Sequence, residues 1–173
     1  MSSRFPNIFF TADIAALLRI AEWRVIKFAQ GAEYQIAPSH SDAAGSGTRR
    51  VYDIEDVCQI ALALRLLDSG LGAKAIGEII ALLRRSGRLS DKLALSKREL
   101  KNLYLAVVRL RRTGRGYFGN RTRAAFFVSD PVQAEMDREA RPPNDLMLIS
   151  VGSMFNQLRD RLGNLQSERG REK

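Results

Sequence analysis

The sequence contains one cysteine and one histidine, and this scarcity excludes several kinds of site. Cys58 cannot form an internal disulfide, and its place on the apolar side of a predicted helix favours a buried structural thiol over a reactive one. His40 lies in a predicted loop with no second ligand at metal spacing. We therefore expect no metal site, no cofactor and no histidine-based or other enzyme chemistry.

Long hydrophobic runs are also missing. No apolar stretch approaches the roughly 20 residues that a membrane span needs, and the first residues lack the apolar core of a signal peptide. A composition of 45% hydrophobic and 27% charged residues is ordinary for a soluble globular protein. We expect a cytoplasmic protein built from one domain, or from one small domain and a companion.

The positive charge is unevenly distributed. Residues 1–83 hold 8 Lys+Arg against 9 Asp+Glu, residues 84–123 hold 13 against 2, and residues 124–173 hold 7 against 8, so the net charge of +9 comes from the middle. Such a block indicates an anionic partner such as nucleic acid, although a solvated basic face is the alternative. Within it, Arg111, Arg112 and Arg115 alternate with glycines and aromatics. This arm could clamp a DNA backbone or be a mobile loop tip.

Two short helices are predicted near the N-terminus. Apolar residues recur at helical spacing from Phe10, and a second helix follows over about 21–29. A tight turn between two short helices is typical of a helix-turn-helix. We predict that Trp23, Arg24 and Lys27 face the major groove and count Arg19 among the DNA contacts, whereas the alternative places Trp23 in the core.

A basic strand runs into an acid-rich helix start at 47–57. Arg49, Arg50 and Tyr52 in extended conformation could reach phosphate oxygens, and Asp53 is a candidate N-cap for a helix over about 54–69. Residues 33–36 offer a partner strand across a long loop, which would make about 34–52 a wing. The alternative is a hairpin edge before a well-capped surface helix. A further helix is predicted over about 74–85.

These features resemble the DNA-binding domain of MerR-type transcription regulators over residues 9–84. The resemblance rests on Phe10-Thr11, the stretch Arg50 to Val57, and Gly70-Leu71. It implies a winged helix-turn-helix that binds double-stranded DNA, usually as a homodimer. The sequence departs from the family at three positions: Arg19 replaces its usual Gly, Ala21 its Ser or Thr cap, and Ile26 its Arg. It also shows no long coiled coil, so the last helix or a sheet edge would have to form the dimer.

The second half predicts a small α/β unit. Ser96 to Glu99 form a capping-box pattern, and 103–110 suits a strand better than a helix because 125–128 offers a partner. A helix over 131–140, a strand over 146–151 and a last amphipathic helix to Leu165 follow. We expect the tail, 166–173, to be disordered.

Together these predictions describe an α+β, mainly α protein. Its expected parts are a MerR-like winged helix-turn-helix at 9–88, a small α/β dimerisation or regulatory domain at 96–165, and the tail. The expected function is DNA-binding transcription regulation by a nucleoid-associated homodimer, with any small-molecule effector unknown. The alternatives are an architectural or recombination-directing DNA-binding protein and a basic protein-interaction adaptor.

Overall fold

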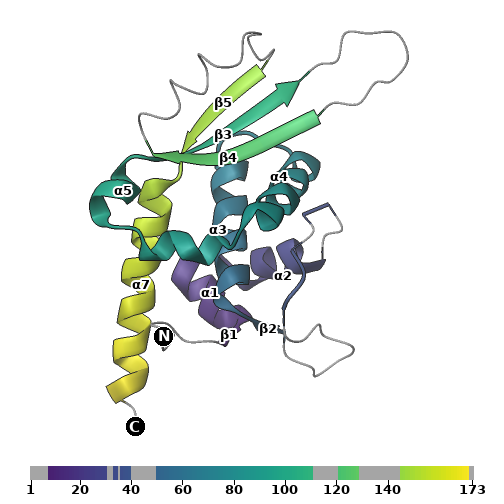
Figure 1. Cartoon of the computed structure of the whole chain (residues 1–173). Helices are drawn as coiled ribbons and strands as arrows, with labels where there is room; N and C mark the ends of the chain where they lie inside the picture. The colour runs from purple at the N-terminus through teal and green to yellow at the C-terminus, as the bar shows by residue number, and fades with distance from the viewer. Residues whose placement is uncertain are drawn as a thin grey trace.

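The computed structural model describes residues 8–30, 33–34, 36–39, 50–110, 121–128 and 145–171. Helices predominate, and the strands form two small sheets, as expected for an α+β, mainly α chain (Figure 1). The helices are α1 (Thr11–Leu18), α2 (Glu22–Gln30), α3 (Ile54–Asp68), α4 (Ala73–Ser86), α5 (Lys97–Lys101) and α7 (Gly152–Arg171), with a 3-10 helix η1 (Leu89–Ala94). The strands are β1 (Phe9–Phe10), β2 (Val51–Tyr52), β3 (Leu103–Leu110), β4 (Arg121–Val128) and β5 (Asp145–Ser150). No described helix is both long and apolar enough to cross a membrane.

Helix α3 runs through the centre of the molecule, and the other helices pack around it (Figure 1). Its start is fixed by a reciprocal cap, because the Asp53 carboxylate accepts from the Asp56 amide at 2.9 Å and Asp56 accepts from the Asp53 amide at 3.0 Å. It ends before Gly70, whose φ of 84° is left-handed. Both signals were predicted. Every residue from Asp56 to Ala63 is buried. The sequence predicted burial along one side of this helix only, but α4, η1 and α7 all pack against α3 and cover its other sides.

Strand β2 pairs with β1, not with residues 33–36 as predicted. Phe9 lies opposite Tyr52, and Phe10 lies opposite Val51. Glu33 and Tyr34 form a turn, and 36–38 are not in a strand. Tyr34 and Ile36 are buried although they form no strand. The alternation of apolar residues at 34 and 36 therefore marks buried positions and not a β-strand. Residues 40–49, the expected wing tip, lie outside the described residues.

The second sheet has the order β4-β3-β5, with both pairs antiparallel. The strand assignment for 103–110 and its pairing with 125–128 are therefore confirmed, since Leu103 lies opposite Val128. The strand predicted at 146–151 is β5. The sheet lies at one end of the molecule, with α4 against β4 (Figure 1). The helix predicted at 131–140 lies outside the described residues.

Helix α7 joins the two halves of the chain. It begins at Gly152, where a Cβ would collide with the backbone carbonyl of Leu100, so the close approach of α5 and α7 requires glycine. It then packs on α1, α3, α5 and η1. Its apolar stripe, Phe155, Leu158 and Leu162, is buried in one cluster with the N-terminal helices. The stripe is thus used within the chain, and the boundary expected between 88 and 96 does not separate two cores.

The end of α7 corrects one prediction. The helix continues to Arg171, so the expectation that the chain is disordered from Gln166 is wrong up to that residue. The residues beyond Leu165 are polar, and they extend a helix that the packing of Leu158 and Leu162 has already established.

Candidate nucleic-acid interface

Helix α2 presents polar and aromatic side chains on its outer face. Trp23 is 63% exposed, and Lys27 and Gln30 are also exposed. These residues follow one another at spacings of four and three, which places them on one side of a helix. The interpretation that buries Trp23 in the core is therefore wrong. Trp23 is the one tryptophan of the chain, and it lies on this surface.

The inner face of α2 is held firmly. Val25 is fully buried and Phe28 nearly so. The Phe28 ring packs edge-on against Tyr34, with the ring centroids 4.7 Å apart and the planes inclined by 69°. The turn that contains Glu33 lies so close to α4 that a Cβ at Gly77 would collide with the Glu33 carbonyl. The packing of its inner face and of the turn that follows it thus holds α2 in place, with its outer face towards solvent.

The turn between α1 and α2 takes three residues. Arg19 ends α1 in the left-handed conformation, at φ 55° and ψ 47°. The Ile20 amide donates to the Ala15 carbonyl at 3.0 Å and the Arg19 amide to the Ala16 carbonyl at 3.3 Å, the hydrogen-bond pattern of a Schellman end. Glycine adopts this conformation most readily, so an arginine here carries a small conformational cost. The Arg19 side chain is exposed beside the start of α2.

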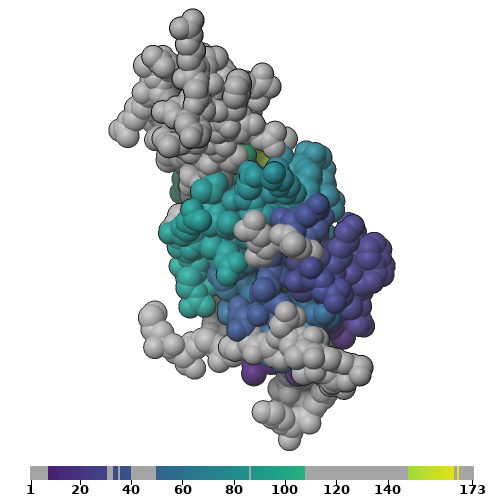
Figure 2. All heavy atoms as spheres, turned by 90° about the vertical axis from the view of Figure 1, so that its right-hand side faces the viewer, coloured from purple at the N-terminus to yellow at the C-terminus, as the bar shows by residue number. Residues whose placement is uncertain are grey.

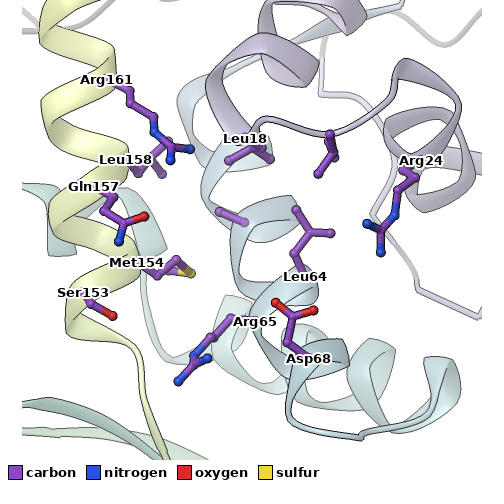
Figure 3. Close-up of a pocket in the computed structure, with 12 residues that line it drawn as sticks. Leu18, Arg24, Leu64, Arg65, Asp68, Ser153, Met154, Gln157, Leu158 and Arg161 are labelled. Carbon is purple, nitrogen blue, oxygen red and sulfur yellow. The ribbon is translucent and has the colours of Figure 1, made fainter.

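Arg24 differs from its neighbours on α2. Its side chain is half-buried and lines a hollow enclosed by the end of α1, by α2, by α3 and by α7 (Figure 3). The sequence predicted that Arg24 and Lys27 share one outward side. The structure instead places Arg24 in the lining of the hollow, with its side chain directed towards the end of α3 (Figure 3). Trp23 and Lys27 are thus the predicted contacts that remain on the outward face.

The predicted wing residues fall into three groups. Tyr52 is fully buried beside the N-terminal strand, so the prediction that its hydroxyl reaches a phosphate is wrong. A strand alternates its side chains between two faces, and the β1 pairing directs Tyr52 into the core. Arg50 is half-buried at the start of β2. Arg49 lies outside the described residues. The structure therefore overturns the 33–36 strand pairing and the Tyr52 contact of the predicted wing, and it leaves the Arg49 and Arg50 contacts as predictions.

The acids that begin α3 serve the fold in a way that the sequence did not predict. Asp56 is 1% exposed. Its carboxylate accepts from the amide of Ser39 at 2.9 Å and from the Ser39 hydroxyl at 2.8 Å, besides the Asp53 amide. Burial raises the pKa of this carboxyl, and the hydrogen bonds from Asp53 and Ser39 offset part of the rise. Asp56 thus ties the segment after α2 to α3.

Glu55 makes a second such tie. Its two carboxylate oxygens accept from the amides of Leu89 and Ser90, each at 2.9 Å. These are orphan amides at the start of η1, so Glu55 caps that helix from a distance of 34 residues along the chain. Only the three-dimensional fold brings these groups together, and no local motif could have predicted the contact.

The basic block of the sequence is described only in its first part. Lys97, Arg98 and Lys101 are exposed on α5, and Arg85 and Arg88 are exposed near the end of α4. In the view from the right of Figure 1, the purple surface that includes α2 forms an outer edge, and the teal surface of residues near 80–100 is visible beside it (Figure 2). Arg111, Arg112 and Arg115, the predicted arm, lie outside the described residues.

The chain has one cysteine and one histidine as candidate reactive side chains. Cys58 is fully buried, and burial raises the pKa of its thiol well above the usual range, with the carboxylates of Glu55 and Asp53 adding to the rise. Within the described part of the chain, no three His, Cys, Asp or Glu residues cluster as metal ligands would. His40 lies outside that part.

Comparison with known proteins adds no further assignment. Neither a scan against protein-family models nor a search of curated proteins finds a match to this chain.

Proposed function

We propose that the protein binds double-stranded DNA by placing α2 in the major groove. The observation that carries this proposal is the division of α2 into a buried face and an outward face with Trp23 63% exposed. Desolvating an indole normally stabilises a fold, so an exposed one on a rigid helix favours a recognition role. Lys27 adds a charge that suits phosphate.

The arrangement of α1 and α2 also supports the proposal. A helix-turn-helix reads DNA with its second helix while the first supports it. Here α1 is buried through Ile14 and Leu17, and α2 lies after a three-residue turn. Arg19 is exposed in that turn, and we propose it as a phosphate contact. With the MerR-type resemblance, we propose a transcription regulator that acts as a homodimer, with Arg49, Arg50 and the 109–123 arm as secondary backbone contacts.

The test is selection of bound duplexes from a random DNA pool, followed by titration of the best duplex with variants. We expect Trp23→Ala combined with Lys27→Ala to weaken binding by roughly a hundredfold, because a base-edge contact and a phosphate contact are lost together. Lys101→Ala is the matched control, since it removes one charge from α5 on the other side of the molecule (Figure 1). Equal loss in both variants would show that only overall charge matters and would overturn the proposal.

The same measurement separates the alternatives. A regulator selects a defined sequence, whereas an architectural DNA-binding protein covers DNA without one. An adaptor for an acidic protein would bind the pool no better than other cationic proteins and would release it at moderate salt. Exposed tryptophan is also common at the centre of protein interfaces, so the mass of the complex should be measured alongside.

A further inference from the structure

The hollow beside Arg24 has a volume of about 310 Å³, at the lower end of the range for small-molecule sites (Figure 3). Four separate parts of the chain surround it: the end of α1 and the turn after it, α2, α3 and α7. It is separate from the outward face of α2. The inference drawn from it does not depend on the proposed DNA binding.

Positive charge is concentrated in the lining of this hollow. Arg24, Arg65 and Arg161 contribute three guanidinium groups from α2, α3 and α7, and Asp68 contributes the one carboxylate (Figure 3). Arginine remains charged at any pH at which a protein stays folded. The lining therefore carries three positive charges against one negative charge, and this balance attracts an anion into the hollow.

Two of these arginines are held in place and keep free donors. Arg65 donates from Nε to the Ser150 carbonyl at 3.0 Å, and Arg161 donates from Nη1 to the Leu17 carbonyl. The Arg161 bond is 2.6 Å long. A guanidinium has five N–H donors, so each group keeps further donors after making its bond. Two fixed cations with unused donors are a preorganised site for oxyanions.

Arg24 is the third cation of the lining. Its side chain is half-buried, and among the described residues its guanidinium makes no hydrogen bond and no ion pair. Asp68, on the same lining, does not pair with it. The guanidinium nitrogens remain open to the hollow, so their donors are available to a ligand oxyanion.

The rest of the lining is largely apolar. Leu18, Leu64 and Met154 are partly buried and pack against the main core. Leu158, behind them, is 2% exposed. An inorganic anion would leave these side chains uncovered, whereas a ligand with an apolar part would bury them. The lining thus combines charge recognition with an apolar floor.

From this combination, we propose that the hollow binds a small organic anion, with a carboxylate, sulfonate or phosphate group held by Arg24, Arg65 and Arg161 and an apolar part on Leu18, Leu64 and Met154. The ligand would bridge α7 to α2. Ligand binding would therefore stabilise the packing of the last helix against the first two.

The test uses 8-anilinonaphthalene-1-sulfonate as the probe, since it joins a sulfonate to an aromatic part and fluoresces when it is shielded from water. We expect saturable 1:1 binding to the full chain. Benzoate should displace the probe at lower concentration than inorganic phosphate does. Equal potency of the two competitors, or failure of both, would overturn the proposal.

Variants locate the probe. Arg24→Gln should weaken probe binding roughly tenfold or more, because a charge-assisted hydrogen bond is lost. Arg98→Gln, which removes the same charge from exposed α5, should leave it unchanged. Gln157 is an exposed lining residue, so Gln157→Glu adds a negative charge to the lining and Gln157→Lys adds a positive one, without disturbing the core. We expect weaker binding from the first and equal or tighter binding from the second. Unchanged binding in both Gln157 variants would place the probe elsewhere and refute the site.

Discussion

The outer face of α2 and the start of α3 are both short polar stretches, but their side chains serve opposite purposes. At the start of α3, Asp53 and Asp56 cap each other, Asp56 holds Ser39, and Glu55 holds the start of η1. On α2, Trp23 and Lys27 face outward. The difference teaches that polar character does not distinguish a residue that maintains the fold from one that remains available to a partner. Hydrogen-bond geometry does.

The largest effect in this comparison is expected from Asp56→Ala. It leaves three donors, two of them on Ser39, without their acceptor in a buried position. We expect the free energy of unfolding to fall by about 2–4 kcal/mol, measured by urea denaturation. Asp68→Ala makes the same chemical change at the exposed end of α3 and should alter stability by less than about 0.5 kcal/mol. Equal losses of stability in the two variants would show that the hydrogen bonds of Asp56 do not stabilise the fold.

Glu55→Ala should have the next largest effect. Two amides at the start of η1 lose their acceptor, although water can replace it in part because the site is only partly buried. We expect a loss of about 1–2 kcal/mol and faster hydrogen exchange at Leu89 and Ser90. Glu78→Ala on the exposed side of α4 is the control. Unchanged hydrogen exchange at the Leu89 and Ser90 amides would contradict their hydrogen bonds to Glu55.

Ala21→Ser would make the start of α2 more like that of α3. Ala21 precedes α2 and has no side-chain acceptor, whereas Asp53 caps α3. A serine hydroxyl there should raise the free energy of unfolding by about 1 kcal/mol. Ala16→Ser, at an exposed position inside α1, should instead lower it by a few tenths of a kcal/mol. A loss of stability in Ala21→Ser would indicate that this backbone does not accept a cap.

Trp23→Ala should have the smallest effect on stability. Because the indole is 63% exposed, its removal should change the free energy of unfolding by about 0.5 kcal/mol or less. In the intact protein, acrylamide should quench its fluorescence almost as well as that of free tryptophan. Weak quenching, or a loss well above 1 kcal/mol, would mean that Trp23 belongs to the core and not to a recognition face.

The sequence predicted the elements that carry their own local signals. The caps at Asp53 and Ser96 and the glycine after α3 were sufficient to place the ends of their helices. The apolar run of β3 fits a helix or a strand, and the strand prediction also needed the partner segment 125–128. Contacts between distant segments could not be predicted in this way. Three features depend on segments that meet only in the folded chain: the partner of β2, the inward direction of Tyr52 and the place of Arg24 in the hollow beside α3.

The same limit applies to the candidate interface. A period of 3.6 residues predicts that Val25 and Phe28 share a side of α2, and both are buried. It places Arg24 near the edge of that side, where one neighbouring helix decides whether a long side chain faces solvent or protein. In the fold Arg24 lies in the lining of the hollow beside the end of α3, a placement that no periodicity within α2 specifies.

The packing of α7 has a consequence for how the protein is made. Arg161 donates to the carbonyl of Leu17, a bond that spans 144 positions, and Phe155, Leu158 and Leu162 complete the core around α3. During synthesis on the ribosome, α1, α2 and α3 emerge long before α7, the helix that covers their apolar side chains. The newly made N-terminal half must therefore expose apolar surface until α7 has been made and has left the ribosome, and we expect it to depend on chaperones during that interval.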